Sequence, residues 1–572
     1  MDILRFPKKS RKTGSRKSSK RLLALYLVCL IILLGISYRL VDLQVVEAGQ
    51  LGEQARTQRS ISLEVPANRG DILDRNGKIL AMSIEKDTIF ATPYFVEETA
   101  TTAKELGKIL GEDWEPIYEK LTRSSGFEYL RRKADRSVAK KIREAALPGI
   151  DMYPESERFY PGRSLAGHTI GFLGMENDAL TGLELAFDKK LRGKPGSLEM
   201  ERDTQQRPIP GTPLVSKPPT HGEDLDLTID KEIQYKAQVE LKKAVKAADA
   251  AGGWVIVIES ASGEILALAN EPTFDLNKFS ETDEALFRNR IVTDVYEPGS
   301  TLKIVTAAAA LEEGLYVPES VFALPGTMAV GGYTIGEAYP RGTEIFTFSQ
   351  IVEKSSNIGA ITLAQALGKE RLYSYARDFG LTTRVGIELP GEAQGFIPTP
   401  DQWSASTLAT VSYGQGISAT ALEMIRAVNV IPSGGTLVNP TLIRSGDDSS
   451  RTSEAINKQD GRGARVISRK TAATMAEILQ RAVENGTGKR ARIPGFTVGG
   501  KTGTANKVKP GAGYEPGKYI SSFVGFTPVE KPGITILVSI DEPQGVYYGG
   551  VVAGPVFASV GEYALQRLKI TP

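Results

Sequence analysis

The stretch Tyr296-Glu297-Pro298-Gly299-Ser300-Thr301-Leu302-Lys303 places a serine and a lysine three residues apart. Pro298-Gly299 predicts a tight turn that leads into a helix, and the apolar run 304–311 predicts that this helix is buried. Ser300 then lies near the helix N-terminus, where the macrodipole favours a developing alkoxide. Because residues i and i+3 share a helix face, we expect the buried Lys303 amine to reach Ser300 Oγ and accept its proton.

The chain has few other ways to activate a serine. It contains two histidines, His168 and His221, and one cysteine, Cys29. A Ser-His-Asp triad would need one of these histidines, and His168 is better interpreted as a structural residue. A metal site built from histidine and cysteine lacks ligands, so we predict no metal and no cofactor. A lysine is therefore the expected base.

A second motif, Lys501-Thr502-Gly503-Thr504, follows Thr497-Val498-Gly499-Gly500 and predicts an extended strand. Gly503 would leave room for a substrate backbone to approach closely. Lys501 and the hydroxyls of Thr502 and Thr504 can hold a substrate carboxylate by charge-assisted hydrogen bonds.

A third motif is Ser355-Ser356-Asn357, the single Ser-x-Asn of the chain. Ser355 can relay a proton between the lysines and a leaving amine, and Asn357 can hydrogen-bond a substrate amide. Taken alone, the tripeptide also fits an ordinary turn or helix cap.

Each motif has a decoy or a plain structural alternative. Ser-x-x-Lys also occurs at residues 83–86 and 137–140, and Lys-Thr-Gly also occurs at residues 12–14. Ser137 lies in a charged stretch that predicts a solvated helix, unlike the apolar run after Ser300. Context therefore favours Ser300.

The charge distribution is uneven along the chain. Residues 1–21 carry nine Lys or Arg and one acid, Asp2, whereas the rest carries 61 basic and 67 acidic residues. A basic nucleic-acid-binding body is not indicated, and we predict no nucleic-acid partner. Because an apolar segment follows it, the basic run Lys8-Lys9-Ser10-Arg11-Lys12 is interpreted as part of a cytoplasmic tail, residues 1–21.

Leu22 to Tyr38 is a stretch of seventeen residues without a charge, flanked by Arg21 and Arg39. This length suits a short membrane span with snorkelling arginines, so we predict a transmembrane anchor at residues 22–40. The positive-inside bias places the N-terminus in the cytoplasm and the catalytic part on the outer, periplasmic side of the cytoplasmic (inner) membrane. A cleaved signal peptide is the disfavoured alternative, because charges separate Val46-Glu47-Ala48 from the apolar run.

Residues 41–222 are predicted to form a mixed pedestal domain with no chemistry of its own. Asp74-Arg75-Asn76-Gly77-Lys78 carries an Asn-Gly hairpin signal between two short apolar segments. The tripeptide Arg69-Gly70-Asp71 is better interpreted as structural than as a cell-adhesion motif. The Pro-rich segments 207–213 and 218–219 predict a connector at the domain boundary.

Residues 223–572 are predicted to form the catalytic domain. Segments 254–258 and 264–268 flank Ser260-Ala261-Ser262-Gly263 and predict a β-hairpin. A long, mostly helical and loop-rich middle part separates this hairpin from three strand signals and a terminal helix, at residues 498–505, 521–526, 533–540 and about 556–568. Strands at both ends with helices between them indicate an α/β (α+β) fold, with helices packed on one antiparallel sheet.

Together the motifs resemble those of the class B penicillin-binding proteins, membrane-anchored peptidoglycan D,D-transpeptidases. The family's three active-site motifs match Ser300 to Lys303, Ser355 to Asn357 and Lys501 to Thr504 in order and spacing. Similarity covers roughly residues 60–570 and includes further pedestal and catalytic-domain motifs at residues 69–77, 158–162, 182–184 and 227–230. The resemblance implies a penicillin-binding transpeptidase and serine β-lactamase-like domain, a dimerisation-like pedestal and one N-terminal transmembrane helix.

The resemblance also implies roles for the motif residues. Ser300 would attack the penultimate D-Ala carbonyl of a donor stem peptide, with Lys303 taking its proton. The backbone N–H groups of Ser300 and Thr504 would form the oxyanion hole. Ser355 and Lys501 would assist protonation of the leaving D-Ala, and an amine of a neighbouring stem peptide would resolve the acyl-enzyme. β-Lactam antibiotics would mimic the donor and acylate Ser300. Sequence alone does not decide which lysine is the base.

Three features resemble the division-specific, septal branch of the family: Asn357, the lead-in at residues 296–299 and the stretch at residues 412–416. They imply a role in septal wall synthesis during cell division, with an elongation-type transpeptidase as the alternative. The implied partners are a polytopic glycan polymerase and other divisome membrane proteins, besides stem peptides that end in D-Ala-D-Ala.

Two other hypotheses use the same motifs. A membrane-anchored serine β-lactamase needs a carboxylate that activates the deacylating water, and the chain has no Glu-x-x-Leu-Asn signature. A non-catalytic penicillin sensor or divisome scaffold is disfavoured by the intact motifs and by the short cytoplasmic tail.

Overall fold

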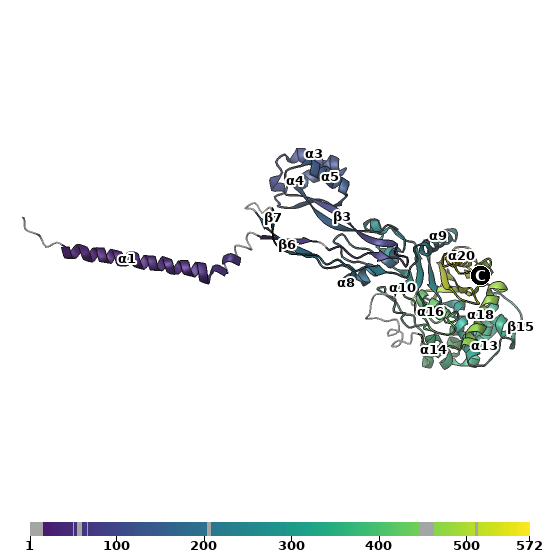
Figure 1. The fold of residues 1–572 in the computed structure, drawn as a ribbon. Helices are drawn as coiled ribbons and strands as arrows, with labels where there is room; N and C mark the ends of the chain where they lie inside the picture. The colour runs from purple at the N-terminus through teal and green to yellow at the C-terminus, as the bar shows by residue number, and fades with distance from the viewer. Residues whose placement is uncertain are drawn as a thin grey trace, which may run out of the picture. The chain divides into compact units, whose positions relative to one another are not determined.

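The computed structural model of the protein describes residues 15–49, 51–53, 60–65, 67–202, 208–444, 463–509 and 513–572. The chain divides into two compact units (Figure 1), Met1–Ala67 with Lys194–Thr220 and Asn68–Gly193 with His221–Pro572. The basic run predicted to form the cytoplasmic tail, at residues 8–12, lies outside the described residues.

The first unit contains the predicted apolar helix. Helix α1 (Ser15–Val41) continues as a π-helical turn, η1 (Asp42–Val46). Among the described residues, Lys20–Val46 is the one helical stretch long and apolar enough to cross a membrane, and none of its most apolar part is buried. The predicted span from Leu22 to Tyr38 lies within this stretch, and Cys29 is exposed on it. The helix therefore fits a single membrane anchor.

A three-stranded antiparallel sheet completes the first unit. Its strands are β1 (Ser60–Val65), β6 (Gly196–Arg202) and β7 (Pro208–Lys217), in the order β1-β6-β7. The Pro-rich stretch from Pro208 onward is thus a strand, which corrects the predicted connector. β7 lies at the sheet edge, the position in a sheet where prolines are tolerated because one side of the strand is unpaired. Residues 203–207 lie outside the described part.

A mixed five-stranded sheet forms the pedestal part of the second unit. The strands are β2 (Ile72–Leu73), β3 (Ile79–Ala91), β4 (Glu128–Ala134), β5 (Ile150–Phe159) and β8 (Leu225–Asp226). Their order is β4-β3-β2-β8, and β5 pairs with β3. The Asn-Gly hairpin prediction is confirmed, since β2 and β3 pair antiparallel on either side of that turn.

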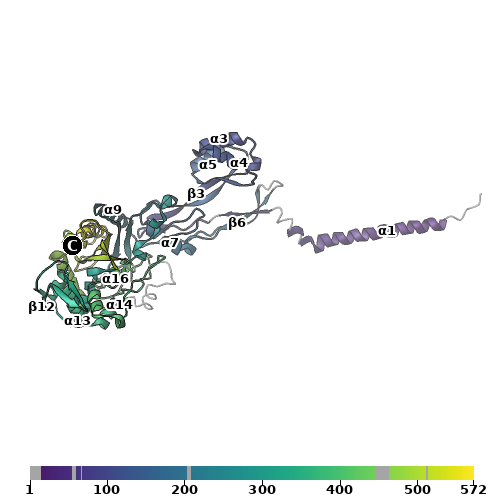
Figure 2. The same cartoon turned by 180° about the vertical axis from the view of Figure 1, so that it is seen from behind.

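Helices cover one face of β3, β4 and β5 (Figures 1 and 2). They are α3 (Thr99–Leu110), α4 (Trp114–Leu121) and α5 (Arg136–Ala145). Their apolar sides pack with the strands around a separate core that includes Ile89, Leu106 and Ile142. Short elements join the pedestal strands: η2 (Pro93–Phe95), α6 (Gly167–Ile170), α7 (Gly182–Ala186) and α8 (Asp188–Leu191).

A buried ion cluster lies in the pedestal. Glu184 is fully buried, and its carboxylate accepts from Arg69 Nε at 2.6 Å and from Arg158 Nε at 2.7 Å. Arg69 also pairs with Asp188 at 2.7 Å. Because the Arg69 side chain is buried in this cluster, the structural interpretation of Arg69-Gly70-Asp71 is supported.

The catalytic sheet has five antiparallel strands in the order β10-β9-β19-β18-β17. They are β9 (Gly252–Glu259), β10 (Ile265–Glu271), β17 (Gly499–Lys509), β18 (Gly513–Thr527) and β19 (Ile534–Asp541). The predicted hairpin is the β9–β10 pair, and each of the three later strand signals falls on one of the remaining strands. The two ends of the domain therefore meet in one sheet, as predicted.

Helices pack on both faces of this sheet because side chains alternate along its strands. On one face, Val255 and Val257 pack with α9 (Lys231–Ala247) and α20 (Gly554–Arg567). On the other, Ile256 and Ile258 belong to the larger core. That core includes α11 (Lys303–Glu312), α13 (Asn357–Leu367), α16 (Ala421–Asn429) and α18 (Arg469–Glu484).

The middle part between β10 and β17 contains more strand than expected. Three short antiparallel pairs form within it: β11 (Val295–Tyr296) with β16 (Ala419–Thr420), β12 (Val321–Leu324) with β15 (Glu344–Thr347), and β13 (Thr327–Val330) with β14 (Tyr333–Gly336). Strands this short carry too little periodicity to be recognised in a sequence. This part also contains α10 (Arg290–Thr293), α12 (Phe348–Glu353), α14 (Lys369–Asp378) and α15 (Ala405–Ser412), and α19 (Gly549–Val552) follows β19.

Candidate active site

Ser300 lies in a single 3-10 turn, η5 (Gly299–Leu302), which runs directly into helix α11. This confirms the predicted turn and buried helix. Gly299 has a φ of +56°, and a Cβ there would lie 3.2 Å from Thr504 O on strand β17. Glycine adopts this conformation without strain and lets the two backbones approach. The half-buried Ser300 is therefore presented beside β17.

Lys303 is the first residue of α11 and is 2% exposed. Its Nζ donates to Ser355 O at 2.6 Å and to Asn357 Oδ1 at 2.7 Å, and it lies 3.3 Å from Ser355 Oγ. Burial holds the pKa of Lys303 well below its ordinary value, the nearby charge of Lys501 lowers it further, and Glu337 acts in the opposite direction.

Lys501 approaches the same serine from the opposite side. It lies on β17, is 1% exposed, and its Nζ donates to Ser355 Oγ at 2.8 Å. Burial lowers the pKa of Lys501 to about 7. In the described part of the chain neither lysine forms an ion pair with a carboxylate, and their hydrogen bonds go to neutral oxygens.

The predicted Lys303–Ser300 contact differs from the geometry found. Among the described residues, the hydrogen bonds of the Lys303 amine go to Ser355 and Asn357, and none goes to Ser300. The two side chains share the start of one helix, but three oxygens of the Ser-x-Asn motif compete for the amine. Such catalytic hydrogen bonds are often long without substrate and tighten in the complex.

The Ser355-Ser356-Asn357 motif joins two helices. Ser355 has a φ of +60°, which is uncommon for a residue with a side chain and is found at functional sites. Ser356 is the N-cap of α13, where its Oγ accepts from Gly359 N at 2.9 Å. Ser356 thus acts as the helix cap, while the hydroxyl of the adjacent Ser355 lies within hydrogen-bond distance of both lysines.

Strand β17 carries the Lys501-Thr502-Gly503-Thr504 motif. The Thr502 and Thr487 hydroxyls lie 2.8 Å apart, and Thr504 Oγ1 accepts from Gly549 N at 3.3 Å. A Cβ on Gly503 would lie 2.3 Å from Ser522 Oγ and 3.0 Å from a methyl group of Thr301. Glycine here therefore allows β17 to pack against its own neighbours, which is a different reason from the predicted room for a substrate backbone.

The histidines lie outside this cluster of motifs. His168 is buried, its Nε2 lies 2.8 Å from Leu286 O, and burial lowers its pKa to about 4. His221 Nδ1 accepts from Asn68 N at 3.0 Å. These contacts support structural roles for both residues.

Two carboxylates beside the motifs were missed. Glu337, which follows β14, accepts from the Ser356 hydroxyl and from Asn357 N at 2.6 Å. Glu297 accepts from Gly416 N at 2.8 Å and from the Tyr514 hydroxyl at 3.0 Å, and burial raises its pKa. Glu297 stands three residues before Ser300, so its place in the sequence could have indicated a residue beside the active site. Nothing in the sequence near Glu337 indicates its contacts with residues 356 and 357.

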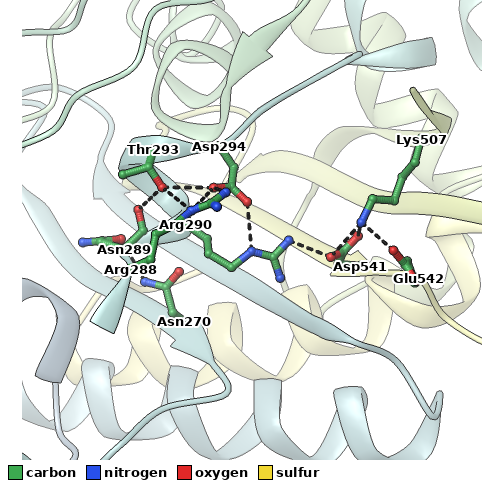
Figure 3. Close-up of polar contacts among 9 residues, drawn as sticks. All are labelled: Asn270, Arg288, Asn289, Arg290, Thr293, Asp294, Lys507, Asp541 and Glu542. Atoms are coloured by element: carbon green, nitrogen blue, oxygen red, sulfur yellow. Dashed lines mark hydrogen bonds and ion pairs between the residues drawn. The ribbon is translucent and has the colours of Figure 1, made fainter. Parts of the chain in front are cut away.

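A second charged cluster lies further along β17 (Figure 3). Asp541 lies 2.6 Å from Arg290 Nη2 and 3.0 Å from Lys507 Nζ. Lys507 also pairs with Glu542 at 2.6 Å, and Arg290 with Asp294 at 2.9 Å. Each of these five charges has an opposite charge in contact, so the cluster ties α10 to β17 and β19 and serves structure.

Two family models match the chain. The penicillin binding protein transpeptidase domain matches residues 253–562, which carry all three motifs, and the penicillin-binding protein dimerisation domain matches residues 64–227. The chain belongs to the class B penicillin-binding proteins. The family resemblance and the fold class expected from the sequence are confirmed, and the protein is a serine-type peptidoglycan D,D-transpeptidase.

Curated relatives match this transpeptidase along nearly its whole length. It is 34% identical to stage V sporulation protein D of Bacillus subtilis over 560 residues, covering 97% of this chain and 86% of that protein. It is 32% identical to the peptidoglycan D,D-transpeptidase FtsI of Escherichia coli over 565 residues, covering 96% and 92%.

Solved structures agree with this result. Penicillin binding protein 3 from Mycobacterium tuberculosis, complexed with aztreonam, is 30% identical with a TM-score of 0.68, covering 89% of this chain and 98% of that one. A peptidoglycan synthetase from Bifidobacterium adolescentis is 29% identical with a TM-score of 0.70, covering 90% and 97%. The division of this penicillin-binding protein at residues 21, 40 and 222 stays a prediction.

Proposed function

We propose that Ser300 is the nucleophile of this transpeptidase and Lys303 its base. The supporting observation is the meeting of all three motifs at Ser355, whose Oγ accepts from Lys501 at 2.8 Å and lies 3.3 Å from Lys303 Nζ. Burial lowers the pKa of Lys303, which favours the uncharged amine that a base needs to accept a proton.

In the acylation step, Ser300 Oγ bonds to the carbonyl carbon of the penultimate D-Ala while its proton passes to Lys303 Nζ. The backbone N–H groups of Ser300 and Thr504 stabilise the oxyanion. The C–N bond to the terminal D-Ala then breaks, and its nitrogen receives the proton through Ser355, which Lys501 contacts. The amine of a second stem peptide attacks the ester, gives up a proton by the same route and releases Ser300.

Substrate binding is assigned to β17 and to the Ser-x-Asn motif. We propose that Lys501, Thr502 and Thr504 bind the donor carboxylate, next to the small Gly503. Because Thr504 Oγ1 already accepts from Gly549 N, its own O–H is free to donate to a carboxylate. Asn357 would bind the donor amide, and a β-lactam carboxylate would use the same groups.

We further propose that the protein acts in septal wall synthesis during cell division. Support comes from the septal-type features at residues 296–299, 357 and 412–416 and from similarity to FtsI. The basic tail before α1 favours a single-pass topology, with the N-terminus in the cytoplasm and the catalytic domain on the outer side of the cytoplasmic membrane. A polytopic glycan polymerase and other divisome proteins would be its membrane partners. A fluorescent fusion should gather at midcell, and a side-wall pattern would instead indicate elongation.

The chemical proposal is tested by labelling the detergent-solubilised protein with a fluorescent penicillin and mapping the adduct by mass spectrometry. The label should attach to Ser300, and Ser300→Ala should abolish it while the protein stays folded. Ser137→Ala, in a decoy Ser-x-x-Lys, should label like the parent protein. A label on another residue, or none on folded protein, contradicts the proposal. Rapid release of hydrolysed penicillin would instead indicate a β-lactamase.

A further inference from the structure

The carboxylate of Glu337 meets the N-terminus of helix α13. It is 7% exposed, accepts from Asn357 N at 2.6 Å, and accepts from the Ser356 hydroxyl. Glu337 directly follows strand β14, so this short hairpin delivers a buried negative charge to the Ser-x-Asn motif from about 20 residues away in the chain. The helix dipole and the two donors make this a favourable place for a carboxylate.

The neighbouring Gly336 fixes the Asn357 side chain. Asn357 Nδ2 donates to Gly336 O at 3.0 Å, and this contact directs Oδ1 toward Lys303 Nζ, 2.7 Å away. With the amide turned over, its NH₂ group would face the lysine amine and its oxygen would face a carbonyl, and both contacts would be unfavourable. The end of β14 thus determines which atom of Asn357 the base meets.

Glu337 also contributes a charge that acts on Lys303. The charged groups that act on Lys303 are Lys501, from β17, and Glu337, from the loop after β14. Burial is the largest influence and lowers the pKa of Lys303, Lys501 lowers it further, and Glu337 raises it. Arg341 pairs with Glu337 at 2.6 Å and so partly offsets this negative charge.

A purely structural role for Glu337 would be a helix cap. That role is already filled in part, because Ser356 Oγ accepts from Gly359 N at 2.9 Å. A cap stabilises the folded state and has no reason to change how acylation depends on pH. The two roles therefore differ in a measurable way.

We propose that Glu337 is a positioning residue for the transpeptidase reaction, one that orients Ser355-Ser356-Asn357 against Lys303 and supplies a negative charge near Lys303. The inference rests on the proposed function, in which Lys303 takes the proton of Ser300. The hydrogen bonds of Glu337 go to Asn357 N, the Ser356 hydroxyl and Arg341, so it acts on the reaction through the motif.

The test measures the acylation rate constant of the full-length protein with a fluorescent penicillin across a series of pH values. In Glu337→Gln, the rising limb of the profile should move to lower pH, since the charge that favours protonated Lys303 is gone. Its plateau rate should fall about tenfold, because a Gln amide has one acceptor oxygen and cannot accept from Asn357 N, the Ser356 hydroxyl and Arg341 together, so the motif shifts. Glu337→Asp keeps the negative charge. The rising limb of its pH profile should therefore stay at the pH of the parent, even if its plateau acylation rate falls.

Arg341→Gln is the opposite-sign variant. Removing its positive charge strengthens the field of Glu337 at Lys303, so its rising limb should move to higher pH. The inference would be overturned if the rising limbs of the pH profiles of both Glu337→Gln and Arg341→Gln coincide with the rising limb of the parent protein. If Glu337→Gln does not fold, the direction of the Arg341→Gln shift decides alone. Parent protein that carries no label on Ser300 would refute the proposed function instead, before any variant is compared.

Discussion

Two buried charged clusters in this protein are built in opposite ways. In the pedestal, Glu184 lies between Arg69 and Arg158, and each guanidinium has a carboxylate oxygen within 2.7 Å. In the active site, Lys303 and Lys501 are equally buried but share the neutral oxygens of Ser355 and, for Lys303, of Asn357.

The difference separates charges that hold a fold together from charges that are available for chemistry. A paired ion cluster satisfies its members, and losing one partner leaves the others buried without compensation. A buried amine without a carboxylate instead gives up its proton easily, and a lowered pKa at a cleft is typical of catalytic groups. Pairing, rather than burial, distinguishes the two regions.

The largest expected effect concerns Lys303→Met, which removes the base and keeps its apolar stem. Acylation by penicillin should slow about 10³-fold, because a positioned general base contributes rates of this order. The free energy of unfolding should not fall, since the lost amine paid a desolvation cost in the folded state. Stopped-flow acylation and urea unfolding measure the two quantities. An acylation rate within tenfold of the parent rate would transfer the role of base to Lys501.

Glu184→Gln tests the other cluster. Neutralising this carboxylate leaves Arg69 and Arg158 buried without their shared partner, and stability should fall by about 3 kcal/mol. Urea unfolding followed by circular dichroism measures this loss. The acylation rate per folded molecule should not change, because the three catalytic motifs keep their contacts.

Glu144→Gln is the matched control for that variant. Glu144 pairs with Lys140 at 3.8 Å on the exposed side of α5. Such surface pairs contribute little, so stability should stay at the parent value. If Glu184→Gln and Glu144→Gln lower the free energy of unfolding equally, the distinction between buried and exposed ion pairs is wrong.

The remaining prediction concerns the pH dependence of stability at Lys501. Its folded-state pKa is about 7, below an unfolded value of roughly 10.4. Between these values the unfolded chain binds a proton that the folded protein does not, so stability rises with pH through this window. Lys501→Met removes this contribution, and its unfolding free energy should rise less steeply with pH than that of the parent. If the free energy of unfolding changes with pH in parallel for Lys501→Met and the parent, the folded protein does not lower the pKa of Lys501.

Much of the fold followed from local patterns. Pro298-Gly299 before an apolar run predicted η5 and α11, and two apolar segments on either side of residues 260–263 predicted β9 and β10. The short β11–β16, β12–β15 and β13–β14 pairs were missed because their strands have two to four residues each. The strand at Pro208–Lys217 was missed because its prolines indicate a loop, and only pairing with β6 makes it a sheet edge.

For the active site, the sequence by itself determined which residues can act: one serine before a buried helix, two lysines, and a Ser-x-Asn and a Lys-Thr-Gly motif in family order. Only the tertiary structure decided how they are connected. Lys303 contacts Ser355 and Asn357 rather than Ser300, and Glu337 holds the motif from a distant hairpin. Helix starts and turns depend on neighbouring residues, whereas pairing and burial of charges depend on segments that meet only in the folded chain.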